Sequence, residues 1–302
     1  MRRSISTTEI HWVDITDPDD ADLRYLTDEL AIHPVDAEES RRPSSRPRVE
    51  VHPGYVFFVI HVPAHVHEEG VTVSLEFDLF VTTSTLVTVH ESSVRHLEKL
   101  YQEASAGDGA KERVVGRGVA YLLYRILDHL FEVSLPMLDH VAERLARAET
   151  KIFSGHERDM VTELSLIQRD LQGFRGILRP QRHLYEPGTL QDTWGTPTLQ
   201  VVFRSAHAKL RRVWEHLETL WERTEALTDT NAALLNHKLN EFVKTLTIIS
   251  ALFIPLGLVA QTAVFLHAGI PLFNRLSFWL LITLMFLIDF VTLWKARYRQ
   301  IL

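Results

Sequence analysis

Polar side chains recur at helical spacing in a largely apolar segment near the C-terminus. The steps between them are three, four or seven residues, so a helix would carry most of them in one stripe. Hydroxyl and amide oxygens can contact a hydrated cation, and Asp229 would attract cations to one end. Alternatively, Thr247 and Ser250 hydrogen-bond to carbonyls of their own helix. The candidate lining of an ion path comprises Asp229, Asn236, Asn240, Val243, Thr247, Ser250, Ile254, Gly257 and Gln261.

Histidines form a second candidate site, because borderline metals such as Zn²⁺ favour imidazole. The densest group comprises His61, His65, His67 and Glu68. His65 and His67 would share one face of a strand, but we expect Pro63 to interrupt it, which favours a polar strand end over a metal site. His267, which follows the apolar segment, would offer a ring of imidazoles in an oligomer.

Composition and motifs argue against several other classes. The sequence has no Gly-rich phosphate loop, no His-Glu-x-x-His and no nucleophile elbow, so we do not expect an enzyme. It has no Cys, which excludes disulfides and thiolate metal sites. Residues before Val243 include 27 cations and 38 anions. This acidic part would gather cations and repel nucleic acid, unless the charge serves only solubility.

Two apolar segments, residues 246–266 and 276–294, are long enough to cross a membrane. As helices they measure roughly 28–32 Å, close to the thickness of a bilayer's hydrocarbon core. Only residues 267–275 connect them, so we expect a tight hairpin. Asp289 is the one acid inside a span; we expect a structural ion pair with Lys244 or Lys295, with proton coupling as the alternative.

The cations around this hairpin predict its orientation. Lys and Arg flank its outer ends, whereas the connection holds only Arg275. The positive-inside bias then places both termini in the cytoplasm, with residues 295–302 as a basic tail. Residues 1–10 lack the apolar core of a signal peptide. We therefore expect a two-pass protein of the cell (inner) membrane.

Hydrophobic patterning divides the preceding chain into an α/β part, residues 1–110, and a helical hairpin, residues 111–195. In the first part, the predicted strands are residues 56–62, 72–81 and 85–89, and the predicted helices are residues 20–30 and 37–41. Asp36 is the expected N-cap of the second helix. In the hairpin, apolar spacing predicts one helix of roughly 40 residues, with a kink or a change of register at Pro136, and a partner over residues 157–181.

A further helix should begin near Pro197, with Thr196 as its cap. Residues 196–245 form its stalk, which we expect to continue into the first span without a break. A continuous helix of roughly 70 residues measures about 105 Å. Such a helix needs neighbours over its whole length, so we expect an oligomer in which these helices pack side by side.

Two sets of motifs make the chain recognisable. The N-terminal set is residues 12–15, 32–36 and 46–50, and the C-terminal set is residues 244–250 and 253–256. Both resemble the CorA superfamily of divalent-cation channels and transporters, including its ZntB-like zinc-transporting branch. The resemblance implies a homopentamer with an α/β cytoplasmic funnel, a stalk helix and a pore lined by each first membrane helix. Asp229 matches a regulatory acidic position of that family.

The resemblance fails at the family's Gly-Met-Asn tripeptide, which is Gly-Ile-Asn in the zinc branch. This chain has Val264, Phe265 and Leu266 there, and Gln261 replaces a family glycine. None of the three side chains offers an oxygen to a cation, and a ring of them would close by dewetting. Gln261 either supplies a substitute amide ring or helps to plug the path. In this the chain is similar to atypical CmaX-like members.

Together these features predict an α/β cytoplasmic domain, a long stalk helix and a C-terminal membrane hairpin in a CorA-like funnel oligomer. We expect it to pass Zn²⁺, Mg²⁺ or related cations, with a slight preference for zinc-like ions because an acidic loop and the Gly-Met-Asn filter are missing. Its expected partners are copies of itself, the bilayer and divalent cations. The alternative is a non-transporting membrane scaffold or regulator with the same architecture.

Overall fold

The computed structural model describes residues 1–42, 46–66, 71–92, 97–186 and 197–267, and eight residues between 279 and 290. Two compact units divide the described chain, Met1–Thr228 and Asp229–Leu302. The first is called the soluble unit below. Of the predicted site residues, His67 lies outside the described residues, as do the side chains of His65, Phe265, Leu266 and His267. Asp289 also lies outside them.

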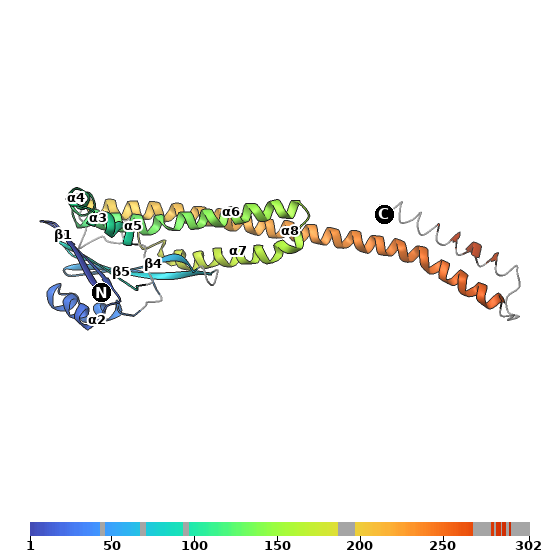
Figure 1. Ribbon diagram of the computed structural model, residues 1–302, viewed down its shortest axis with the longest axis horizontal. Helices are drawn as coiled ribbons and strands as arrows, with labels where there is room; N and C mark the ends of the chain where they lie inside the picture. Colours follow the sequence, from blue (N-terminus) through green and yellow to red (C-terminus); the bar gives the residue numbers. More distant parts are fainter. Residues whose placement is uncertain are drawn as a thin grey trace. The chain divides into compact units, whose positions relative to one another are not determined.

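A six-stranded sheet in the order β1-β2-β6-β5-β4-β3 forms the centre of the soluble unit (Figure 1). Neighbouring strands are antiparallel except for the parallel pair β2 and β6. The three predicted strands are confirmed as β4, β5 and β6. The strands are β1 (Arg2–Ser6), β2 (His11–Thr16), β3 (Arg48–His52), β4 (Tyr55–Val66), β5 (Val71–Val81) and β6 (Thr85–His90). Pro63 does not interrupt β4, which pairs through it with Ser74 of β5.

One face of the sheet is covered by the short helices α1 (Asp20–Arg24), η1 (Tyr25–Glu29) and α2 (Pro34–Glu39). Leu26, Ile32 and Ala37 from this segment join Phe57 and Phe80 from the sheet in one buried core. The predicted cap of α2 was wrong: the side chain of His33, not Asp36, accepts a hydrogen bond from the Val35 N–H. Asp36 lies in the first turn of α2, and its side chain is therefore free to face the sheet.

The opposite face carries α5 (Val119–Glu132), α6 (Ser134–Phe153) and α7 (Glu157–Leu178) (Figure 1). The single helix predicted here was wrong. Helix α4 (Asp108–Val115) ends before Gly116, and Gly118 takes a φ of +100°, which only glycine adopts readily. The second break lies between α5 and α6 because Pro136 has no N–H to donate to the Glu132 carbonyl. Helix α3 (Glu98–Ser105) precedes α4.

The amide of Gln181, which ends the 3₁₀ helix η2 (Arg179–Gln181), completes the sheet edge. Strand β3 ends opposite Val59, so His61 of β4 has no strand partner on that side. The side chain of Gln181, which is fully buried, accepts a hydrogen bond from the His61 N–H at 3.1 Å and donates one to the His61 carbonyl at 2.6 Å. Gln181 therefore binds the backbone of β4 as a further strand would.

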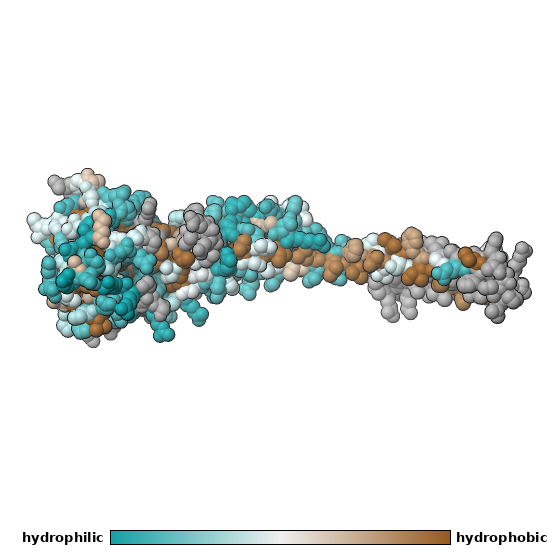
Figure 2. Space-filling model, turned by 60° about the horizontal axis from the view of Figure 1, so that its bottom comes forward, coloured by the Kyte–Doolittle hydropathy of each residue, from teal (hydrophilic) through white to brown (hydrophobic). Residues whose placement is uncertain are grey.

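The long helix α8 (Pro197–His267) is confirmed and has 71 residues, about 107 Å. Its first part belongs to the soluble unit, where Phe203, Leu210, Val213 and Leu217 are buried. Beyond Thr228 many of its large apolar side chains are exposed, and Figure 2 shows apolar residues in brown along this stretch. Within the described residues, one helix is long and apolar enough to span a membrane, with a mean hydropathy of 2.0 over 18 residues. Described residues of the predicted second span are helical and largely exposed.

Candidate functional site

The predicted polar stripe lies on one face of α8. Because each residue of a helix turns by about 100°, the positions from Asp229 to Gln261 fall within an arc of about 100°. Because α8 is continuous over these residues, their side chains stay on the same face of the helix. All of the stripe except Ser250, which is partly exposed, is exposed in the single chain. The side chains that share this arc are Asp229, Asn236, Asn240, Thr247, Ser250, Ile254, Gly257 and Gln261.

From Leu246 onward, apolar side chains occupy much of the rest of the helix surface, whereas earlier in the helix Lys238, Glu241 and Lys244 are exposed there. Leu246, Ile249 and Phe253 are each about half exposed or more, and no part of the chain covers them in the described structure. An exposed apolar surface of this kind marks contact with lipid or with other protein. From Leu246 onward the helix therefore presents one polar face amid apolar ones, which suits a chain whose polar faces meet around a water-filled axis.

Hydroxyl groups on this helix also bond within it. The Thr247 hydroxyl donates to the Val243 carbonyl at 2.8 Å, and the Thr245 hydroxyl donates to the Glu241 carbonyl at 2.9 Å. The alternative predicted for Thr247 therefore holds in the single chain. Its oxygen keeps its lone pairs, so it remains able to accept a hydrogen bond from the water shell of a cation.

The filter positions are only partly described. Val264, the first of the three predicted filter positions, is helical and its apolar side chain is 68% exposed. Gln261, one turn earlier, is also exposed. It is the last described polar side chain before the apolar run.

Of the predicted histidine cluster, only the side chain of His61 lies within the described residues. His61 lies beside Glu76 on the neighbouring strand, with 3.2 Å between Nε2 and Oε2. The pairing is a consequence of strand register, since these two residues stand directly opposite each other. A cross-strand ion pair is therefore the observed role of His61.

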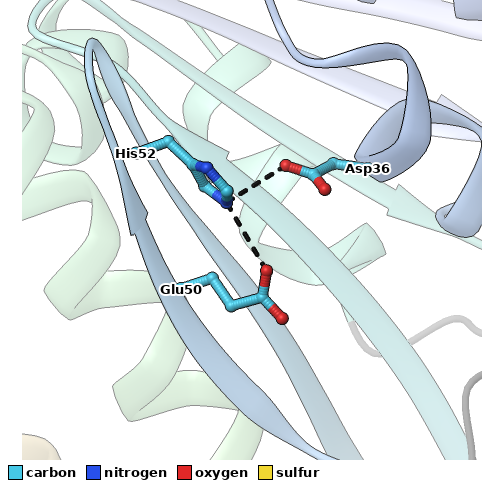
Figure 3. A group of neighbouring side chains, drawn as sticks. All are labelled: Asp36, Glu50 and His52. Carbon is cyan, nitrogen blue, oxygen red and sulfur yellow. Dashed lines mark ion pairs between the residues drawn. The ribbon is translucent and has the colours of Figure 1, made fainter.

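A different cluster joins Asp36, Glu50 and His52 (Figure 3). His52 Nε2 lies 3.2 Å from Asp36 Oδ2 and 3.5 Å from Glu50 Oε2. Sequence reasoning missed this group because Asp36 comes from α2 and the other two from β3. The one local pattern that could have indicated part of this cluster is the spacing of Glu50 and His52. Two residues apart on a strand, their side chains share one face.

Buried ionisable groups line a cavity of about 690 Å³ in the soluble unit. Asp78 is only 3% exposed, and Oδ1 has no hydrogen-bond partner among the residues that the structure describes. Burial, followed by the nearby Glu76 carboxylate, raises the pKa of Asp78 well above its usual value. The Asp78 carboxyl is thus an acid that the fold favours in its neutral form.

A second buried network lies on the opposite face of the sheet. His90 Nε2 is 3.3 Å from Asp14 Oδ1, and Arg3 Nε donates to Asp14 Oδ2 at 2.8 Å. Burial opposes charge on both His90 and Asp14, but their mutual attraction outweighs it. The pKa of Asp14 is therefore lowered and that of His90 raised. Thr88 also donates to Asp14, so the network ties β2 to β6.

Comparisons with known proteins identify a family whose members match most of this chain. A family model described as "CorA-like Mg2+ transporter protein" matches residues 8–295. The cobalt/magnesium transport protein CorA of Methanocaldococcus jannaschii is 25% identical over 302 residues, covering 95% of this chain and 89% of that protein. The cobalt/magnesium transport protein CorA of Thermotoga maritima is also 25% identical, covering 82% and 71%.

Solved structures share the fold. The complete CorA magnesium transporter from Methanocaldococcus jannaschii matches with a TM-score of 0.75 at 21% identity, covering 97% of this chain and 92% of that one. The full-length CmaX protein matches with a TM-score of 0.74 at 16% identity, covering 96% and 90%. The same arrangement of α/β unit and long helix is therefore found in both.

Proposed function

Because the chain belongs to the family of CorA-like Mg²⁺ transporter proteins, we propose that its copies form a ring in which the stripe on α8 lines a path for divalent cations. Family membership makes it a divalent-cation transporter rather than an enzyme. The observation that carries the proposal is the polar arc, which continues beyond Leu246 into a stretch of the helix whose other described faces are apolar and exposed. Five copies is the number implied by the resemblance to the family.

A ring explains why such a helix is stable in a bilayer. Amide groups such as those of Gln261 are costly in hydrocarbon unless they have partners or water. If the stripes of several copies face a common axis, water can hydrate them while the apolar faces meet lipid and other helices. The predicted hairpin, with residues 246–266 inside and residues 276–294 outside, is the topology that we propose for each copy. Both termini then lie in the cytoplasm, below the inner membrane.

The cation would be held by polar oxygens and gated by apolar rings. Asp229 attracts cations at the cytoplasmic approach, and Thr247, Ser250 and Gln261 contact the hydrated ion. Ile254 and Leu246, both exposed in the single chain, would form rings that close by dewetting. We place zinc-like ions slightly ahead of Mg²⁺, because the oxygen-bearing tripeptide and any acid in residues 267–275 are missing.

A matched pair of threonines tests the stripe. Thr247 lies within the arc, whereas Thr245 lies about 160° round the helix from it, at nearly the same depth. Both make the same bond to the carbonyl four residues earlier. In liposomes that contain the full chain, Thr247→Val should lower the saturable cation flux several-fold, and Thr245→Val should leave it unchanged. Equal effects of the two substitutions would contradict the assignment of this face.

A scaffold or regulator that no longer transports is the second candidate. The apolar, exposed Val264 at the first filter position favours it. Leu266→Asn separates the two functions, because an amide ring would restore flux to a continuous but dehydrated path. Flux absent from both the natural chain and this variant, in correctly assembled oligomers, would favour the scaffold.

A further inference from the structure

We infer that Asp36, Glu50 and His52 bind one borderline divalent cation, such as Zn²⁺ or Co²⁺, on the soluble unit and away from the path along α8. The three residues bring one imidazole and two carboxylates to one point (Figure 3). Carboxylates alone would suit Mg²⁺, whereas an imidazole shifts the preference to zinc-like ions. This inference does not depend on transport.

The spacing of the ligand atoms fits such an ion. With metal–ligand bonds of about 2.0–2.1 Å, two ligands of a tetrahedral ion stand about 3.3 Å apart. The contacts from His52 Nε2 to Asp36 Oδ2 and to Glu50 Oε2 are 3.2 and 3.5 Å. All three ligand atoms lie within 4.8 Å of one another.

The imidazole nitrogen lacks any other role within the described part of the chain. His52 Nε2 is shielded from solvent and has no hydrogen-bond partner there, although two carboxylates flank it. A buried polar atom without a partner is costly and calls for an explanation. A bound cation would supply the missing partner and neutralise both carboxylates.

Tyr55 holds two of the ligands in place. Its ring stacks on the His52 ring, with 4.7 Å between centroids and 16° between planes. Its hydroxyl donates to Asp36 Oδ2 and accepts the His33 N–H. Burial, followed by the hydrogen bond to Asp36, raises the pKa of Tyr55 to about 12, so the donor proton is kept. Metal ligands commonly have such supporting contacts, which orient them.

Backbone geometry and access also suit a site. Glu50 and His52 alternate on β3, so their side chains share one face of an edge strand. Arg48 Nε binds Glu50 Oε1 at 2.6 Å and leaves Oε2 directed at His52. The side chains of Glu50 and His52 are 41% and 30% exposed, so a cation and water ligands can enter.

The test is metal binding by the full chain, purified in detergent and stripped with a chelator. Co²⁺ is titrated while its visible absorption is followed, and Zn²⁺ and Mg²⁺ are then added as competitors. We expect Zn²⁺ but not Mg²⁺ to displace one imidazole-bound Co²⁺ per chain. His52→Gln and Glu50→Gln should each weaken that binding by at least about 100-fold. Both side chains are partly exposed, so the fold should tolerate these changes.

His183→Gln is the matched control. His183 also lies beside a carboxylate, with 2.6 Å between its Nδ1 and Glu186 Oε1, but it is exposed and far from the cluster in sequence. This variant should bind Co²⁺ as the natural chain does. Tyr55→Phe should weaken binding by about 10–100-fold while the ligands remain. Equal loss in His52→Gln and His183→Gln, or no imidazole-bound Co²⁺ in the natural chain, would overturn the site.

Discussion

Replacing Gln181 should destabilise the soluble unit by an amount that can be estimated from its contacts. Its amide serves both the N–H and the carbonyl of His61, which has no strand partner on that side. Gln181→Met leaves both backbone groups unpaired in a buried position. At about 1–3 kcal/mol for each group, the expected loss is about 2–6 kcal/mol. For a unit of this size, that lowers Tm by roughly 4–24 °C.

The assay is thermal unfolding of the detergent-purified chain, followed by circular dichroism. The matched control is Gln102→Met, because the Gln102 amide makes only an exposed contact, 2.9 Å from Glu98. Gln181→Glu provides a second check. A carboxylate can accept from the His61 N–H but cannot donate to its carbonyl, so the loss should shrink at acidic pH, where the introduced carboxyl gains a proton. If Gln181→Met and Gln102→Met melt within about 1 °C of each other, the reasoning is refuted.

Three further predictions concern the water path and two buried carboxyls. A water-soluble thiol reagent should label Ser250→Cys but not Ile249→Cys in membranes, because only the first lies on the stripe at that depth; equal labelling would contradict the orientation. Asp78 has a raised pKa, so stability should fall as pH rises from about 3.8 toward that pKa, by about 1.4 kcal/mol per unit. Asp78→Asn should abolish this slope in denaturation curves, and an unchanged slope would exclude Asp78 as its source. The Asp14–His90 pair should stabilise the fold below pH 6.5 and lose that effect as pH rises through the raised pKa of His90, a loss that His90→Gln should remove from the same curves.

Some elements of the fold were predictable from local sequence and others were not. The strands β4, β5 and β6 could be predicted from their runs of β-branched and aromatic residues. These runs occur because both faces of these strands are largely buried. Strands β1, β2 and β3 were missed. β1 and β3 lie at the sheet edges and carry charges such as Arg3 and Glu50, whereas β2 is central and buried but carries Asp14 within a short apolar run. The helix predicted through residue 118 was wrong because the conformation of Gly118 outweighs the apolar spacing around it.

The two candidate sites also differ in whether the sequence alone could predict them. The stripe could be predicted because all its members lie on one helix, so that spacing alone fixes their relative positions. The Asp36, Glu50 and His52 cluster depends on α2 packing beside an edge strand, which no local pattern encodes. Likewise, Gln181 meets His61 across 120 residues of sequence. Tertiary contacts of this kind are beyond reasoning from periodicity.

The central claim is that copies of α8 enclose a path for divalent cations. The most direct test is cation uptake into liposomes that contain the purified chain, measured separately for Zn²⁺, Co²⁺, Ni²⁺ and Mg²⁺, beside Gln261→Ala. The account predicts saturable uptake, slightly stronger for zinc-like ions, that Gln261→Ala changes. No uptake of any of these ions by a correctly assembled oligomer would contradict it.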